Sequence, residues 1–540
     1  MRQRPNLHFR ATAVAASLLA LAGCAVGPNF KPPAPPTQTT YLPPGERAPL
    51  TNEGLAATPV QTVDLGAQVT ADWWTLFHSA ELDAVVRQAI AGSPTLDGAR
   101  ARLAQANEQV RSTHANLLPQ VGFGATEAEE KYSATAFGLP PDVFPLPSHF
   151  NLFQLGPSAS YHVDAFGGLH RQVEAQAAQA DYQRDQLDAA YLTLTGETVS
   201  QALQVAAARA ELQAAAEIVS LDQQNLDLVR KSEQAGEAPE SDVALSQSQL
   251  AADQTLSPAL EQDLDVARHA LAVLTGRAPS DWSPPDFDLA ALTLPQALPV
   301  SLPSELIHHR PDIMAAEAQL HTASARIGVA TARLYPDITL NAGISAASLN
   351  AGALFDPSGL VWSVAAGLTQ PVFDGGMRRA ERLAALDAFR ASAADYRQTV
   401  LRAFEQVADI LRALDHDGAM VAAEQRSLAS ANESLRLQTI NYRDGGTGLL
   451  ALVDSQRQFQ QARLGYARAL AGRYLDTARL LMAMGGGWWG AKLDEAPPQS
   501  STMSKSDLGV PQAGQAQSEG MSSQRVPGAM PPSASPSASS

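Results

Sequence analysis

Gly376 to Asp444 read GMRRAERLAALDAFRASAADYRQTVLRAFEQVADILRALDHDGAMVAAEQRSLASANESLRLQTINYRD and contain no proline. Within this stretch, apolar residues recur at steps of four or three, which places them on one helical face: Tyr396, Val400, Phe404, Val407 and Leu411. A single helix of this length extends roughly 100 Å at 1.5 Å per residue. Such a length is typical of a coiled-coil rod or of a tube that crosses a compartment.

A second proline-free stretch, Gly168 to Gly236, carries Leu187, Tyr191 and Leu194 at similar spacing. Three blocks also recur in the same order, which indicates a duplicated unit. The matched pairs are Ser93 onward with Arg310 onward at a shift of 217, DAFGGLHR (Asp164 to Arg171) with VFDGGMRR (Val372 to Arg379), and Glu233 onward with Tyr442 onward at a shift of 209. The second pair sets Phe166 opposite Phe373. Each copy is predicted to contain helix, strand, strand, long helix and helix.

Between the helices the apolar period changes from 3.6 to 2. Apolar residues alternate with small or polar ones from Ile338 to Ala346, from Trp362 to Leu368 and from Leu155 to Val163. Each alternating run is about the 9 to 11 residues that a tilted strand needs to cross a bilayer. We predict strands at about 119–137, 150–166, 336–348 and 360–372. A soluble antiparallel sheet alternates in the same way.

The N-terminus has the features of a secretory leader. Three arginines precede the apolar stretch Ala11 to Ala22, which is too short to span a bilayer. The leader ends in LAGC, and Cys24 is the only cysteine, which excludes an intramolecular disulfide. LAGC resembles the lipobox of bacterial lipoproteins, which implies that Cys24 is lipidated and becomes the first mature residue. Ala25 then implies sorting to the outer membrane. An ordinary leader with a chance cysteine is the alternative.

Charge and motifs exclude other classes of function. The net charge is −17, or −20 without the three leader arginines, which argues against nucleic acid as a partner. HExxH, CxxC, GxSxG and P-loop patterns are missing, so we expect no enzyme, no cofactor and no metal site. The adjacent His308 and His309 are poorly placed for joint ligation, and we predict that they lie in the loop before Arg310.

Four strands cannot close a membrane barrel, because such barrels start at about eight strands. Open sheet edges are not tolerated in lipid. If the strands cross a membrane, several chains must share one barrel, and a trimer would supply about twelve strands.

The element order, LAGC followed by AVGPNFKPP (25–33), DWWTLF (72–77) and YRDGGTGLLALVDSQR (442–457) together resemble the TolC-type outer-membrane factors. The resemblance is to their lipoprotein branch (NodT/OprM-like), which serves RND-type pumps, and it covers Cys24 to about Gly487. It implies a mainly α fold with membrane β: a homotrimer whose twelve-stranded outer-membrane β-barrel continues into a long periplasmic α-helical barrel. The chain would be a passive exit duct, lipid-anchored in the outer membrane, that docks a periplasmic adaptor (membrane fusion protein) and an inner-membrane RND-type pump.

The resemblance also implies a division of the chain. The predicted segments are a signal peptide at 1–23, a lipidated extended segment at 24–80, efflux repeat 1 at 81–276, a linker at 277–303, efflux repeat 2 at 304–487 and a disordered tail at 488–540. Asp72-Trp73-Trp74 would serve packing near the first helix, although ligand binding is an alternative.

The resemblance implies a periplasmic gate at the tip of the second helical hairpin. The positions that match the family's gating residues are Tyr442, Arg443, Leu450, Asp454 and Arg457. The first copy has Glu233, Leu245 and Ser248 opposite Tyr442, Asp454 and Arg457, so the polar set belongs to one copy. Asp454 and Arg457 share a helix face, and an ordinary surface ion pair worth under about 1 kcal/mol is the alternative. Ala451 replaces a second gate aspartate that some members have.

Two other functions fit part of the pattern. A type I protein-secretion system also needs an exit duct, and a lipid-anchored structural rod or adhesin would use the same long helices. The lipid anchor and the Gly27-Pro28-Asn29-Phe30 start favour the drug-pump branch.

Overall fold

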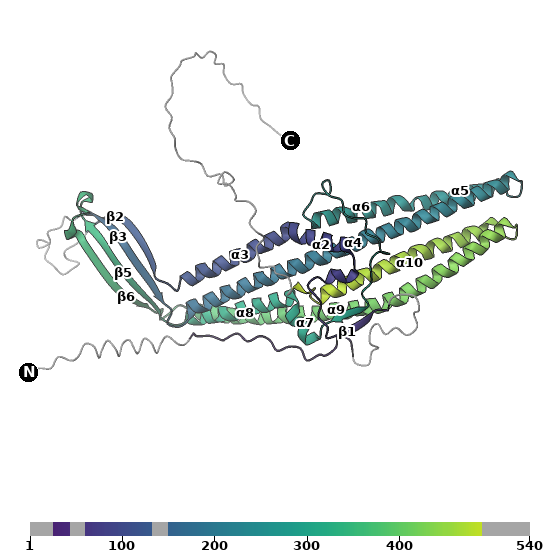
Figure 1. Cartoon of the computed structure of the whole chain (residues 1–540). Coiled ribbons are helices and arrows are strands. Elements are labelled where there is room, and N and C mark those ends of the chain that lie inside the picture. Colours follow the sequence, from purple (N-terminus) through teal and green to yellow (C-terminus); the bar gives the residue numbers. More distant parts are fainter. Residues whose placement is uncertain (1–24, 44–59, 132–148, 489–540) are drawn as a thin grey trace, which may run out of the picture. The chain divides into compact units, whose positions relative to one another are not determined.

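The computed structural model describes residues 25–43, 60–131 and 149–488, so the predicted signal peptide, Cys24 and the tail after Trp488 lie outside the described residues. Figure 1 shows the elements. In chain order they are β1 (Thr62–Leu65), η1 (Trp73–Phe77), α2 (Ala80–Gly92), α3 (Pro94–Ala115), β2 (Gln120–Glu130), β3 (Phe150–Val163), α4 (Gly168–Gln234), α5 (Glu240–Gln254), α6 (Leu256–Leu274), β4 (Ala297–Val300), α7 (Pro303–His309), α8 (Pro311–Ala332), β5 (Asp337–Ser348), η4 (Ala351–Ala353), η5 (Pro357–Gly359), β6 (Leu360–Thr369), α9 (Met377–Arg443) and α10 (Leu449–Ala483).

The two predicted long helices are confirmed as α4 and α9, each of 67 residues. Both begin after a glycine in the left-handed region, Gly167 at φ 74° and Gly376 at φ 89°, a conformation that glycine adopts without a Cβ clash. These two glycines are 209 apart. Aligned on them, Phe166 lies opposite Gly375, so the predicted match of Phe166 with Phe373 is wrong.

The predicted apolar helix faces are buried. Leu187, Tyr191 and Leu194 of α4 and Tyr396, Val407 and Leu411 of α9 are each at most 6% exposed. Removal of these side chains from water is the main contribution that holds such long helices to their neighbours. α4 packs against α3, α6 and α5 and also against α8 and α10, whereas α9 packs against α8 and α10.

The predicted final helix of the first copy is two helices, α5 and α6, that meet at Thr255. Pro258 explains the break, because a proline ring within a helix clashes with the carbonyl four residues earlier, here Gln254. α5 ends at that residue. The corresponding α10 has no proline and continues for 35 residues.

The prediction for His308 and His309 is wrong. These residues form the last turn of the short helix α7 rather than a loop. Pro303 at the first helical position starts α7, where its missing N–H is no loss, and Arg310 in extended conformation separates α7 from α8.

The four predicted strands form one antiparallel sheet in the order β2-β3-β5-β6. β2 pairs with β3, β3 with β5, and β5 with β6. The observed strands lie within the predicted ranges, and residues 132–137 of the first prediction fall outside the described residues. A separate pair, β1 and β4, joins the N-terminal segment to the region between the two copies. β2 and β6 are the edges of the larger sheet.

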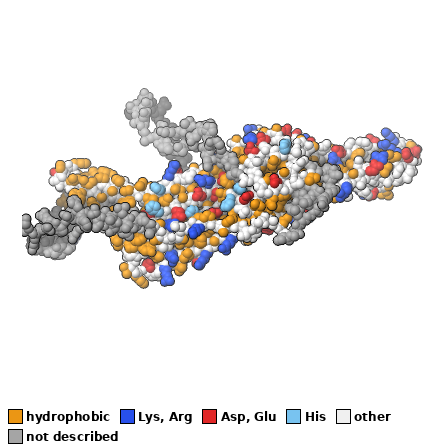
Figure 2. Space-filling model, turned by 60° about the horizontal axis from the view of Figure 1, so that its bottom comes forward, with side chains coloured by type: hydrophobic (Ala, Val, Ile, Leu, Met, Phe, Trp, Pro, Cys, Tyr) orange, Lys and Arg blue, Asp and Glu red, His pale blue; other side chains and the backbone are white. Residues whose placement is uncertain are grey.

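One face of this sheet is apolar and open to its surroundings. Cross-strand partners on that face include Ile344 with Trp362 and Ala342 with Val364. Trp362, Val364 and Phe123 are 73%, 75% and 71% exposed. Figure 2 shows apolar side chains grouped over the strand end and charged side chains over the helix tips. Among the described helices, none combines the length and the apolarity needed to cross a membrane.

An aromatic cluster packs near the middle of α4. Trp73 and Trp74 are 0% and 1% exposed, with ring centroids 6.2 Å apart in an edge arrangement. Trp74 Nε1 donates to Asp83 Oδ1 at 2.9 Å. Both indoles are therefore packing residues, as predicted, with no face left for a ligand.

Trp74→Ala should destabilise the protein by about 3–5 kcal/mol, because it leaves a cavity and removes one of the hydrogen-bond donors to Asp83. Thermal unfolding in detergent, followed by circular dichroism, measures the effect. Phe355→Ala, at a side chain that is 82% exposed, is the matched control and should leave the midpoint unchanged. Equal midpoints for both variants would contradict the packing role.

Candidate gate at the tip of the helical hairpins

The two hairpin tips have the same backbone turn. Gly236, between α4 and α5, and Gly445, between α9 and α10, both adopt positive φ, at 77° and 71°. Glu237 N donates to Ser232 O, and Gly446 N donates to Asn441 O, each at 2.8 Å. All these positions correspond at a shift of 209. The predicted gate residues therefore lie on a backbone that the first copy also has.

Tyr442 faces the first copy. Its ring packs against an apolar cluster at the tip, formed by Val229, Leu435, Leu449, Leu452 and Val453. Its hydroxyl is hydrogen-bonded to Ser232 of α4, and burial, followed by the charge of Asp242, raises the pKa of Tyr442. Ser232 is a partner that the sequence did not reveal.

Arg457 also contacts the first copy. Its Nε donates to Gln249 Oε1 of α5 at 3.0 Å. Asp454 accepts from Gln458 Nε2 at 2.8 Å. The alternative of a surface ion pair between Asp454 and Arg457 therefore does not describe the side chains as they lie, since each has another partner.

The remaining gate residues are open to solvent. Leu450 is 76% exposed, and Arg443 and Asp454 are also exposed. Leu450, Asp454 and Arg457 follow at steps of four and three, so they share one face of α10. The structure thus joins Tyr442 and Arg457 to the first hairpin and leaves Leu450 and Asp454 on a surface that a neighbouring chain or a pore can face.

A mostly buried polar layer lies next to the apolar cluster at the tip, on the side farther from the turns. We define it as Asp222 of α4, Gln249 and Asp253 of α5, and Gln456 and Gln460 of α10. Asp253 accepts from Gln249 Nε2 at 2.8 Å and from Gln460 Nε2 at 2.7 Å. The sequence prediction missed this layer, although one signal was present: Ala431 and Ala462 stand opposite Asp222 and Asp253 in the second copy.

A second feature lies where the strands meet the helices. The described chain begins at Ala25, and Val26 N donates to Phe166 O at 3.1 Å. Arg171 Nη2 then donates to Asn29 Oδ1 at 2.6 Å. A Cβ on Gly167 would lie 2.5 Å from Ala25 Cα, so only glycine allows this close approach. These contacts hold the N-terminal segment at the base of β3.

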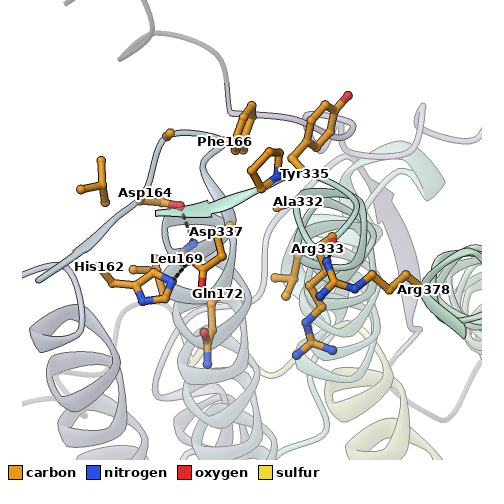
Figure 3. Close-up of a pocket in the computed structure, with 15 residues that line it drawn as sticks. His162, Asp164, Phe166, Leu169, Gln172, Ala332, Arg333, Tyr335, Asp337 and Arg378 are labelled. Carbon is orange, nitrogen blue, oxygen red and sulfur yellow. Dashed lines mark hydrogen bonds and ion pairs between the residues drawn. The ribbon is translucent and has the colours of Figure 1, made fainter. Parts of the chain in front are cut away.

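A cavity of about 260 Å³ opens beside this contact (Figure 3). Asp164 contacts His170 Nδ1 at 2.6 Å, and Asp337 contacts His162 Nε2 at 2.5 Å. Phe166 stacks on Tyr335 at the rim, with ring centroids 4.6 Å apart. Each acid of the cavity therefore has a histidine partner, and the aromatic pair ties the two copies together at the base of the sheet.

The comparisons with known proteins agree on one family. The family model described as outer membrane efflux protein matches residues 85–277 and 302–486. The pyoverdine export outer membrane protein OpmQ of Pseudomonas putida is 30% identical over 457 residues, which cover 84% of this chain and 94% of the relative. The cation efflux system protein CusC of Escherichia coli O6:H1 is 28% identical over 479 residues, 87% of this chain and 97% of the relative.

The solved structure of the outer-membrane channel OprN superimposes with a TM-score of 0.76 at 26% identity, and the alignment covers 86% of this chain and all of that one. These matches confirm the prediction of an outer-membrane efflux duct with a mainly helical, TolC-type fold. The chain belongs to the outer membrane efflux protein family.

Proposed function

We propose that three copies of this chain assemble into one continuous duct, the exit channel of a tripartite efflux pump. Three copies of the four-stranded sheet would close a barrel of twelve strands. The observation that carries the proposal is the pair of unpaired edges, β2 and β6, on a sheet whose apolar face is exposed. In lipid the backbone groups of both edges need partners, and another copy of the same chain can supply them.

The register of the sheet supports a head-to-tail arrangement. Adding 217 to each β2 position and 209 to each β3 position converts the β2–β3 pairs into the β5–β6 pairs. Gln120↔Ser160, for example, becomes Asp337↔Thr369. For the β3–β5 pair Val163↔Ile338, adding 209 to the β3 position and subtracting 217 from the β5 position gives Val372↔Val121. This pair would place the residues directly after β6 opposite β2 of the next subunit.

The helices support the same arrangement. α4 buries more than twice as many residues as α9, although the two helices are equally long. The difference lies in partners, because α4 contacts α8 and α10 of the second copy and α9 has no equivalent neighbour within the described chain. Its open side carries Leu401, 61% exposed, and Met420, 55% exposed. Helices α3, α5 and α6 of the next subunit would cover this side.

An engineered disulfide tests the proposed pairing between β2 of one subunit and the β6 end of the next. Val372 is 97% exposed and Val121 is 75% exposed, and directly opposite residues in an antiparallel pair bring their Cβ atoms to about 4.5–5.5 Å. Val121→Cys with Val372→Cys should give covalent trimers on a non-reducing gel after mild oxidation. Val121→Cys with Phe373→Cys is the matched control, since a shift of one residue turns the side chain to the other face. Equal cross-linking by both pairs would contradict the register.

We also propose that Cys24 carries the lipid anchor. Ala25, the next residue, contacts Gly167 at the base of β3, which is where a membrane-spanning sheet would leave the bilayer. An acyl chain on Cys24 would therefore start at the level of the inner leaflet and would not pull the segment away from the helices.

Cys24→Ser should abolish the incorporation of labelled palmitate into the protein, because the thiol is the only acyl acceptor of its kind in the chain. Metabolic labelling followed by immunoprecipitation measures this. The control is Ala25→Asp, which should keep the label and shift the protein toward the inner membrane. Retention of the label by Cys24→Ser would overturn the assignment.

The gate follows from the trimer. Asp454 is exposed on α10, so three copies would present three carboxylates to one axis, where they repel one another and favour cations. Leu450 lies one turn nearer the tip and would narrow the same opening. Tyr442 and Arg457, through Ser232 and Gln249, would hold the second hairpin against the first and keep the tip closed, and Arg443 would add positive charge at the turn.

Asp454→Ala should raise single-channel conductance in planar bilayers by about twofold or more, because it shortens three side chains that face the opening and removes the contact with Gln458 that holds each of them in place. Asp444→Ala, in the exposed turn, is the control for a loss of charge at the tip. An unchanged conductance for Asp454→Ala would count against the gate.

The proposed partners and cargo follow from the family to which the chain belongs. A periplasmic adaptor would bind the helical tips, and an inner-membrane RND-type pump would supply the energy, since the duct has no energy source of its own. The names of two relatives refer to the export of pyoverdine and to the efflux of cations. We propose drugs or other small molecules as the cargo of this duct.

A further inference from the structure

The polar layer interrupts the apolar packing of the hairpins at one level. Toward the tip lies the cluster that includes Val229 and Leu452. On the other side lies a second apolar cluster of Ala214, Ile218 and Leu464. Asp222 and Asp253, between them, are only 4% and 6% exposed. Burial of two carboxyl groups between apolar clusters is costly unless each has hydrogen-bond partners.

The two carboxyl groups face each other within reach of a hydrogen bond, and the amide of Gln456 of α10 lies beside Asp222. Asp222 Oδ2 has no other hydrogen-bond partner among the described residues. Two ionised carboxylates have only acceptors, so this contact needs one proton. Burial, followed by the hydrogen bond to Asp253, raises the pKa of Asp222 to about 7. The layer is therefore complete only while it holds that proton.

The layer is connected to the proposed gate through one amide. Gln249 donates its Nε2 to Asp253 and accepts from Arg457 Nε with its Oε1. The orientation of this amide is fixed, because a carboxylate cannot donate and a guanidinium cannot accept. Asp253 thereby determines where Gln249 presents the oxygen that binds Arg457.

The second copy packs the same hairpin without carboxyl groups. Ala431 and Ala462, opposite Asp222 and Asp253, are 8% and 4% exposed. Small apolar residues therefore satisfy the packing of two helices at this level, and the fold itself does not require acids. The pair of aspartates is a departure of one copy, as the set around Tyr442 and Arg457 is.

We propose that Asp222 and Asp253 form a proton-dependent latch that positions Gln249 to hold Arg457, and that ionisation of both carboxyl groups releases the gate. Asp222 and Asp253 are positioning residues in this proposal, which rests on the proposed gate. The protonated latch joins α4, α5 and α10; the ionised latch places two like charges in a buried layer and pushes α4 and α5 apart.

The direction of the pH effect follows from the surroundings. Asp222 faces Asp253 from α5 and the neutral amide of Gln456 from α10, and Gln460 of α10 binds Asp253. Two arginines of α10 near this layer have other partners: Arg457 donates to Gln249, and Arg463 pairs with Glu217 at 2.9 Å. Because the closed layer holds a proton that an opened, hydrated layer releases, the open state gains population as pH rises from the ordinary value of 3.8 toward about 7.

The test is single-channel recording of the full-length trimer across pH 5 to 8. For the wild type, the ratio of open to closed time should rise by up to about tenfold per pH unit below pH 7 and level off above it. Asp222→Asn donates to Asp253 at every pH and should stay closed without a pH slope. The double variant Asp222→Ala with Asp253→Ala has the alanines that the second copy has at these positions. It should show a higher ratio of open to closed time than the wild type at every pH, also without a slope.

Asp417→Asn is the matched control. Asp417 of α9 is a half-buried acid, and partial burial and the neighbouring Asp476 raise its pKa to about 6. It lies 27 residues before the turn at Asp444, so its variant should keep the wild-type slope. Trimer recovery by size exclusion shows whether each variant folds.

Two results would overturn the latch: a wild type without the slope, or an Asp222→Asn variant that retains it. Asp454→Ala separates the two proposals. If Asp454→Ala leaves the conductance unchanged and Asp222→Asn removes the pH slope, the proposed ring of Asp454 carboxylates is wrong and the latch is supported. If Asp454→Ala raises the conductance and Asp222→Asn keeps the slope, the ring is supported and the latch is wrong.

Discussion

The unpaired backbone of β2 and β6 is the constraint on which the rest depends. Each edge presents N–H and C=O groups that cost several kcal/mol apiece when they have no partner in hydrocarbon. A chain with four strands cannot satisfy both edges. The proposed trimer resolves this by pairing β6 with β2 of the next copy, and the helices that continue from the strands must then close a ring as well. The exposed apolar side of α9 is the consequence at the level of the helices.

Because the chain contains two copies of one structural unit, the positions at which the copies differ point to roles that only one copy has. Where both copies solve the same packing problem, as at the glycines that start α4 and α9, their residues agree. Where they differ on an identical backbone, the fold alone does not explain the difference. Tyr442 against Glu233 and Asp222 against Ala431 are such differences, and both lie at the level where the hairpins of the two copies meet. Residues that agree in the two copies build the repeated wall of the proposed tube, whereas residues that differ belong to the proposed gate, which only one copy forms.

Local patterns predicted most of the fold, because helix and strand periodicity are properties of neighbouring residues. The lengths of α4 and α9 and the alternation in β5 and β6 could be read directly. The break at Thr255 was readable from Pro258 but was missed. The pairing of β3 with β5 and the contact of Arg457 with Gln249 join residues about 200 positions apart, and no local signal specifies such partners. Comparison of the copies would have found Asp222 and Asp253.

A passive gate must be held by contacts that a docking partner can overcome. To move an equilibrium from mostly closed to mostly open takes about 5.5 kcal/mol. Two of the hydrogen bonds between the hairpins involve the proposed gate residues, Tyr442 with Ser232 and Arg457 with Gln249. At about 0.5–1.5 kcal/mol per bond, six such bonds in the proposed trimer give roughly 3–9 kcal/mol. This range brackets the requirement, so a small set of hydrogen bonds at the tip suffices, and a single proton per subunit in the layer beside them is enough to shift the balance.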